Sequence, residues 1–85
     1  MKEVHPSEIK IGDYYIQEMA DNILLKRRIK GKNMNNNEIW GVYIKFLKGD
    51  WERNMHLGSD GFSFERDEHI KWYLLSEGEA LLYMI

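Results

Sequence analysis

The residues best suited to chemistry in this sequence are basic and aromatic, and most of them lie in two neighbouring runs. Lys26, Arg28 and Lys30 alternate along the first run, and Tyr43 and Lys45 alternate along the second. If the two runs are paired strands, alternation places all five side chains on adjoining faces. Arginine and lysine beside flat rings can hold phosphates, stack on bases or bind an acidic protein. We therefore predict an anion-binding or protein-binding face here.

Three further residues are candidates for the same binding face. Tyr15 can extend it from the preceding strand, and Trp40 and Arg53 can line a pocket beside it. Charge is segregated along the chain, because the middle third is positive and the two ends are negative, with a net charge of −2 overall. A positive region can attract an anion, but ordinary charge pairing between neighbouring strands is the alternative explanation.

The motifs of common enzyme and metal sites are missing. The chain has no cysteine, and no serine lies in a Gly-x-Ser-x-Gly elbow. His5, His56 and His69 lack the spacing of zinc ligands, and the glycines match neither the P-loop nor the dinucleotide-binding pattern. The acidic run before His69 leaves metal binding as an alternative to a simple charged loop. We expect a non-enzymatic protein with no cofactor and no metal.

The length and composition are those of one small domain over residues 1–85. Aromatic residues make up 13% of the chain and supply a core in the absence of disulfides. No apolar run reaches the roughly 20 residues that cross a bilayer, and the first residues lack the apolar segment of a signal peptide. We therefore expect a cytoplasmic protein without a membrane partner.

Alternating apolar and polar residues predict five or six short strands. The predicted strands cover residues 14–19, 23–30, 38–47, 51–57, 62–64 and 70–74. In the third strand, Trp40, Val42, Ile44 and Phe46 are predicted to face the core. Gly41 in the same strand indicates a bulge, a bend or the close approach of another group. The stretch from residue 58 to residue 61 is predicted to be a turn.

Two short helical segments flank these strands. Ser7 is predicted to cap a helical turn that follows Pro6. Ser76 and Glu79 form a capping-box pattern, which predicts a helix from residue 77 to the end with an apolar stripe that packs on the sheet. That stripe is predicted to contain Leu81, Met84 and Ile85. The apolar end of the chain either enters the core or contacts another subunit, and we expect a homo-oligomer.

These elements predict a mainly β protein of the α+β class. The strands are expected to form a strongly bent antiparallel sheet, or a small open barrel of the SH3-like or OB-like kind. A short N-terminal helical turn and a capped C-terminal helix complete the predicted fold.

The chain also resembles the short accessory proteins of bacteriophages and mobile elements that act against host defences. The resemblance lies in Ile11-Gly12-Asp13-Tyr14-Tyr15 and in Trp72-Tyr73-Leu74-Leu75-Ser76-Glu77-Gly78-Glu79. It identifies no specific family. It implies a binder in the host cytosol that blocks a host defence protein or sequesters a signalling nucleotide.

Two other functions are compatible with the sequence. A small nucleic-acid-binding barrel would use the basic, aromatic face, although the acidic total charge disfavours it. A structural module of a virion or another oligomeric assembly would use the apolar C-terminal residues as a subunit contact.

Overall fold

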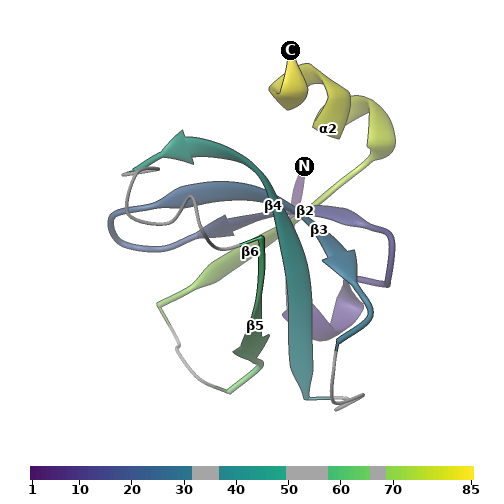
Figure 1. Cartoon of the computed structure of the whole chain (residues 1–85), viewed down its shortest axis with the longest axis vertical. Coiled ribbons are helices and arrows are strands. Elements are labelled where there is room, and N and C mark those ends of the chain that lie inside the picture. Colours follow the sequence, from purple (N-terminus) through teal and green to yellow (C-terminus); the bar gives the residue numbers. More distant parts are fainter. Residues whose placement is uncertain (32–36, 50–57, 66–68) are drawn as a thin grey trace.

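Six antiparallel strands form one open sheet in the computed structural model, which describes residues 1–31, 37–49, 58–65 and 69–85. Across the sheet the strand order is β1-β6-β2-β3-β4-β5 (Figure 1). In chain order the elements are β1 (Lys2–Val4), the 3-10 turn η1 (Pro6–Glu8), β2 (Tyr14–Glu18), β3 (Ile23–Ile29), β4 (Glu38–Lys48), β5 (Ser59–Ser63), β6 (Lys71–Leu75) and α2 (Glu77–Met84). The predicted α+β class with a C-terminal helix is confirmed.

The sheet bends strongly enough to bring its distant strands together. The ring centroids of Phe62 in β5 and Trp72 in β6 are 6.2 Å apart, although three strands separate β5 from β6 in the sheet order. Two register shifts between β3 and β4 mark bulges, which bend a strand and increase its twist. The prediction of a strongly bent antiparallel sheet is therefore confirmed.

The bend gives the sheet a concave face and an outer face, each with its own apolar cluster. On the concave face the fully or nearly buried residues are Val4, Ile9, Tyr15, Ile39 and Trp72. On the outer face they are Ile16, Leu25, Leu75 and Ala80, the last of which belongs to α2. Helix α2 thus packs on the outer face, and β5 covers the concave face.

The capping box of α2 is confirmed, but the predicted inner stripe of this helix is right only for Met84, because Leu81 and Ile85 are exposed. The Ser76 side chain accepts a hydrogen bond from the Glu79 backbone, and the Glu79 side chain accepts one from the Ser76 backbone. Ala80 is the buried residue of the helix, and Tyr83 and Met84 pack beside it at the spacing of one helical face. The small Ala80 side chain lets the helix approach the sheet, which turns the larger leucines outward.

The N-terminal segment differs from its prediction in two ways. A three-residue strand, β1, pairs with β6, and it is too short to carry a detectable alternation. The cap of η1 is His5 rather than Ser7, because the His5 ring accepts a hydrogen bond from the Ser7 backbone. Pro6 is the first residue of the turn instead of preceding it.

The predicted turn at residues 58–61 is wrong, because β5 begins at Ser59. Gly61 lies opposite Trp40 in the β4–β5 pairing, and a Cβ atom there would lie 2.4 Å from Trp40 Cε2. The glycine therefore makes room for the indole ring within a strand instead of forming a turn. The strand predicted over residues 51–57 lies outside the described residues.

The predicted core face of β4 is also wrong over its first half. Ile39 is buried, whereas Trp40, Val42, Ile44 and Phe46 are only half-buried. A regular strand would keep one set of alternate residues on one face. In β4 the pairing steps from Tyr43 to Lys45 and leaves Ile44 as an extra residue, which interrupts this alternation.

No helix among the described residues is long and apolar enough to cross a membrane.

Removing the cap of α2 is expected to destabilise the protein measurably. Ser76→Ala leaves the Glu79 N–H without its side-chain acceptor, and the free energy of unfolding should fall by about 0.5–2 kcal/mol. Urea unfolding followed by tryptophan fluorescence measures the change. Ser76→Thr, which keeps a capping hydroxyl, should stay close to the wild type, and an equal loss in both variants would contradict this role.

Candidate functional site

A buried ion pair lies at the centre of the predicted binding face. The side chain of Lys26 is fully buried, and its Nζ donates a hydrogen bond of 2.7 Å to Asp60 Oδ1. Lys26 belongs to β3 and Asp60 to β5, so the pair spans the intervening strand β4. Because an ammonium without a counter-charge is costly to bury, the Asp60 carboxylate is what permits a charged lysine at this position.

Aromatic groups enclose the same ammonium. Lys26 Nζ lies 4.6 Å from the ring centroid of Tyr43 and 4.7 Å from that of Phe62. The Tyr43 hydroxyl donates to Asp60 Oδ2, so both carboxylate oxygens accept a hydrogen bond. A desolvated cation over an aromatic face gains about 2 kcal/mol. The ion pair therefore has a complete set of partners within the protein.

Tyr15 lies beside this ion pair and explains the glycine in β4. Tyr15 is opposite Lys26 in the β2–β3 pairing and is almost fully buried. A Cβ atom on Gly41 would lie 1.9 Å from the Tyr15 hydroxyl oxygen and 3.3 Å from Lys26 Cδ. The close approach that the sequence indicated at Gly41 is therefore that of the Tyr15 hydroxyl.

Arg28 is half-buried and binds backbone carbonyls. Its guanidinium donates to the carbonyl oxygen of Ile9, and its Nη2 donates to that of Glu38 at 3.5 Å. These two carbonyls belong to the segment after η1 and to the start of β4. Arg28 therefore joins the N-terminal segment to the sheet, and these donors are already used inside the protein.

Four of the eight predicted binding residues are brought together by the structure: Tyr15, Lys26, Arg28 and Tyr43. Their burial does not suit an open binding face, because Lys26 has no exposed area and Tyr15 almost none, while Arg28 and Tyr43 are half-buried. Since the sheet bends until β5 covers its concave face, a basic strand face becomes the interior of the protein. We call these four residues with Asp60 the interior polar cluster.

The other predicted binding residues do not join this cluster. Lys45 points to the outer face, where its Nζ donates to the Tyr83 carbonyl at 3.0 Å, because the bulge at Ile44 separates its face from that of Tyr43. Lys30 is exposed beyond the end of β3, and Trp40 donates from Nε1 to its neighbour Glu38 at 3.1 Å. The remaining candidate, Arg53, lies outside the described residues.

The electrostatics of the interior polar cluster keep its phenols protonated. Burial raises the pKa of Tyr15, the Asp60 carboxylate raises it further, and the Arg28 guanidinium partly opposes both. Burial also raises the pKa of Tyr43, and its hydrogen bond to Asp60 adds to the effect. For Lys26, burial lowers the pKa of the ammonium while the Asp60 carboxylate acts in the opposite direction. The arrangement is that of a stabilising network, since no phenolate is available as a base or nucleophile near neutral pH.

Large apolar side chains gather at a different place, where the N-terminus meets α2. The Met1 ammonium pairs with the Glu79 carboxylate, and the Met1 residue itself is 59% exposed. On α2, Leu81, Leu82 and Ile85 are 54%, 74% and 94% exposed. In the view of Figure 1 the C-terminus lies at the end of α2, and the N-terminus lies between α2 and the strands. We call Met1, Leu81, Leu82 and Ile85 the apolar end.

A pocket adjoins the apolar end where α2 meets the sheet. Its volume is about 330 Å³, and its apolar lining is contributed by Met1, Ile16, Ile23, Leu47 and Tyr83. Its charged group is Glu18, whose carboxylate accepts a hydrogen bond of 3.0 Å from the Tyr73 hydroxyl. This α2 pocket and the apolar end share Met1.

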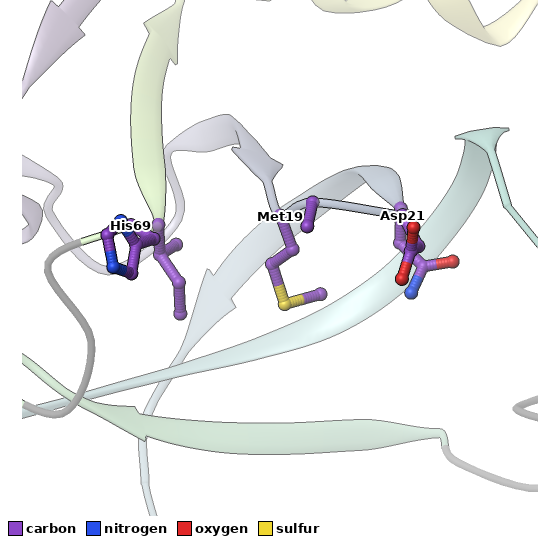
Figure 2. A pocket seen from close by; sticks show the side chains of 6 residues that line it. Met19, Asp21 and His69 are labelled. Atoms are coloured by element: carbon purple, nitrogen blue, oxygen red, sulfur yellow. The ribbon is translucent and has the colours of Figure 1, made fainter.

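A second pocket opens at the β2–β3 turn. Its volume is about 350 Å³, and it is lined by Met19, Ala20, Asp21 and Asn22 of that turn and by His69 and Ile70 before β6. Figure 2 shows Met19 between His69 on one side and Asp21 on the other. We call it the mouth pocket. Within the described ranges, no group of three His, Asp or Glu side chains is placed to hold a metal ion.

The comparisons with other proteins identify no relative. The chain matches no protein-family model, and no curated protein or solved structure matches it either.

Asp60 is the residue of the interior polar cluster that the sequence analysis missed. It lies in a Gly-Ser-Asp-Gly stretch, whose composition is typical of a turn. The sequence offered only an indirect signal. If the strand face that carries Lys26 is buried, a carboxylate must lie nearby to compensate the ammonium. Only the position of β5 in the sheet reveals which carboxylate it is.

The two halves of the ion pair are expected to differ in their mutational cost. Asp60→Asn leaves the Lys26 ammonium buried without its counter-charge and should cost about 3–5 kcal/mol. Lys26→Met removes the buried charge and leaves Asp60, which is partly exposed to water, so it should cost less. A chain of this length has a total stability of about 4–13 kcal/mol, so Asp60→Asn should remove a large share of it.

Urea unfolding at neutral pH measures this difference. Asp21→Asn, which changes an exposed carboxylate in the same way, is the matched control and should leave stability within about 0.5 kcal/mol of the wild type. A Lys26→Met variant that is less stable than Asp60→Asn would contradict the assignment of Lys26 as the desolvated member.

Stability is also expected to pass through a maximum at alkaline pH. Between the lowered pKa of Lys26 and its ordinary value of 10.5, the unfolded chain binds more protons than the folded chain, so stability rises with pH. Above 10.0, the raised pKa values of Tyr15 and Tyr43 reverse the sign, because the folded chain keeps phenol protons that the unfolded chain releases.

Urea unfolding at a series of pH values tests both limbs of this profile. Lys26→Met should abolish the rise and keep the fall, and Tyr43→Phe should reduce the fall. A rise that is unchanged in Lys26→Met would exclude Lys26 as its origin.

Proposed function

We propose that this chain is a non-enzymatic binding protein that acts by occupying a partner protein through its apolar end. The observation that carries the proposal is the exposure of Leu81, Leu82 and Ile85 on one short helix, beside Met1 and the α2 pocket. Large apolar side chains exposed together on one short element are characteristic of protein–protein contacts. Hydrophobic burial supplies the affinity, and the α2 pocket gives a side chain of the partner a place to insert.

The charges around the apolar end favour a particular kind of partner. Glu77 is exposed at the start of α2, and Glu18 lies in the α2 pocket. Acidic groups around an apolar centre complement a surface in which Lys or Arg flank leucine-like side chains. Lys45, which is exposed, lies at the other end of α2, where it binds the Tyr83 carbonyl. The partner surface is therefore apolar at its centre, with a basic group facing Glu77 and an acidic group facing Lys45.

The biological setting follows from the resemblance to phage and mobile-element accessory proteins. Such a protein acts as an inhibitor, and its target is a protein of host defence that it meets in the host cytosol. Inhibition by occupancy needs no catalytic group on the inhibitor. It needs only a surface that competes with the natural contact of the target.

A nucleotide sponge or a nucleic-acid binder built on the basic strand face has less support. The Lys26 ammonium and the Arg28 guanidinium are engaged with Asp60 and with backbone carbonyls. Lys30 and Lys45, which are exposed, lie apart from this pair. A phosphate would have to break the internal ion pair to reach Lys26.

Self-association is the second candidate, because the ends of α2 differ in charge. Glu77 begins the helix, and Lys45 binds the Tyr83 carbonyl at its other end. Two copies with antiparallel α2 helices would place Glu77 of each beside Lys45 of the other, as a two-fold interface requires. The homo-oligomer expected from the sequence, or a larger assembly, would use this contact.

A double substitution at the apolar end is expected to abolish partner binding without unfolding the protein. Leu82→Lys combined with Ile85→Lys keeps the helix propensity of α2 and places positive charges near its C-terminus, where they are favourable. It should also place two charges in the apolar contact, where burying them is costly. Ile11→Lys, at an exposed isoleucine outside α2, is the matched control.

Cross-linking in the producing cell, followed by native mass spectrometry, measures the outcome. The wild type and Ile11→Lys should carry the same partner protein in a fixed ratio, and the double variant should lose it. Retention of that partner by the double variant, or a wild type that carries none, would overturn the proposal. A purified wild type that is a dimer in sedimentation, with a monomeric double variant, would support self-association instead.

A further inference from the structure

Gln17 is a fully buried amide whose polar atoms have no partner among the described residues. It lies in the middle of β2, and neither its Nε2 nor its Oε1 makes a hydrogen bond. Buried polar groups in folded proteins are almost always satisfied, and each exception calls for an explanation. Lys26, the other buried polar residue, has a complete set of partners in the same protein. Among the described residues, the buried ammonium therefore has partners and the buried Gln17 amide has none.

The position of Gln17 relates this amide to the mouth pocket. In the sheet register Gln17 lies between Leu24 of β3 and Trp72 of β6. Alternation along the two strands places Met19 and Ile70 on the same face, one step nearer to the β2–β3 turn. Both of these residues line the mouth pocket. Gln17 thus lies on the same face of the sheet as Met19 and Ile70, one step further from the turn, and does not itself line the mouth pocket.

The mouth pocket has the character of a small-molecule site. Its volume of about 350 Å³ lies within the usual range for ligand pockets, and its lining is mainly apolar with a few polar groups. Met19, at its centre in Figure 2, has an unbranched side chain with three rotatable bonds, and such side chains repack readily. A change of the Met19 rotamer is the simplest way to connect the pocket with the amide.

The Gln17 amide behind the pocket and the Asp21 carboxylate at its rim together favour one class of ligand. A glutamine amide offers a donor and an acceptor side by side, and it pairs in two-point fashion with the edge of adenine. Asp21 at the rim disfavours a phosphate there, since the carboxylate would repel it. The ligand is therefore a neutral, flat heterocycle whose edge has an adjacent donor and acceptor.

We propose that the mouth pocket binds a neutral nucleobase or nucleoside, whose base edge pairs with the Gln17 amide when Met19 moves aside. The bound base satisfies both polar atoms of the amide, which explains why an apolar residue does not occupy this position. The site is separate from the apolar end, so it neither requires nor excludes the proposed partner protein.

Nuclear magnetic resonance can follow the amide directly. Gln17 is the only glutamine in the chain, so selective glutamine labelling with ¹⁵N gives a single side-chain amide signal. Titration of the full chain with adenine, adenosine and adenosine monophosphate should shift this signal for the first two probes and less for the third. A signal that none of the probes moves would overturn the proposal. An equal or stronger response to the monophosphate would overturn the choice of a neutral ligand.

A pair of matched variants separates a ligand site from a purely structural amide. Gln17→Met removes both polar atoms at similar volume, and Leu24→Met changes its cross-strand neighbour while the amide stays. Calorimetry with adenosine should show binding weakened at least about tenfold in Gln17→Met and little changed in Leu24→Met.

Thermal unfolding without a ligand completes the test. Gln17→Met should melt at a higher temperature than the wild type, because it removes an unsatisfied buried group. A lower melting temperature would mean that the amide is already hydrogen-bonded in the free protein and would overturn the proposal. Unchanged adenosine binding by Gln17→Met would also overturn it.

Discussion

Lys26 and Asp60 attract each other across strand β4, and the shape of the sheet depends on this ion pair. Their 2.7 Å contact joins β3 to β5 and holds β5 over the concave face. The pairing works because Tyr43 binds the second carboxylate oxygen and because Gly41 leaves space for the Tyr15 hydroxyl. A buried charge with these partners is costly to disturb, since the loss of one member leaves the other without compensation. The interior polar cluster therefore fixes the register of β3, β4 and β5 together.

Because the interior polar cluster engages the Lys26 and Arg28 side chains, a binding site for another molecule has to lie elsewhere on the protein. Residues that could hold a phosphate on an open strand face are occupied with Asp60 and with backbone carbonyls. The surface offers instead an apolar end on α2, the α2 pocket and the mouth pocket. Binding by apolar contact and shape fits a protein that acts by occupancy. The two proposed sites are lined by different residues.

The two buried polar residues of the sheet illustrate how stability and function can separate. Lys26 is satisfied by an acid and by two rings, as a stable interior requires. Gln17 has no such partners among the described residues, although an apolar side chain would fill its position at lower cost. Residues whose chemistry does not suit their surroundings in the fold tend to occur at functional positions. The contrast between these residues is the reason to assign a ligand to one and a structural role to the other.

The sequence by itself determined the local features of this protein. Alternation predicted β2, β3, β4 and β6, and the Ser76–Glu79 capping box predicted the start of α2, because both signals depend on residues close together in the chain. The tertiary structure alone decided which faces are buried. The bulge at Ile44 moved Lys45 to the outer face, and the small Ala80 side chain turned the leucines of α2 outward. Asp60 became the partner of Lys26 only when β5 paired with β4. These outcomes depend on contacts between strands far apart in sequence, and no local pattern records such contacts.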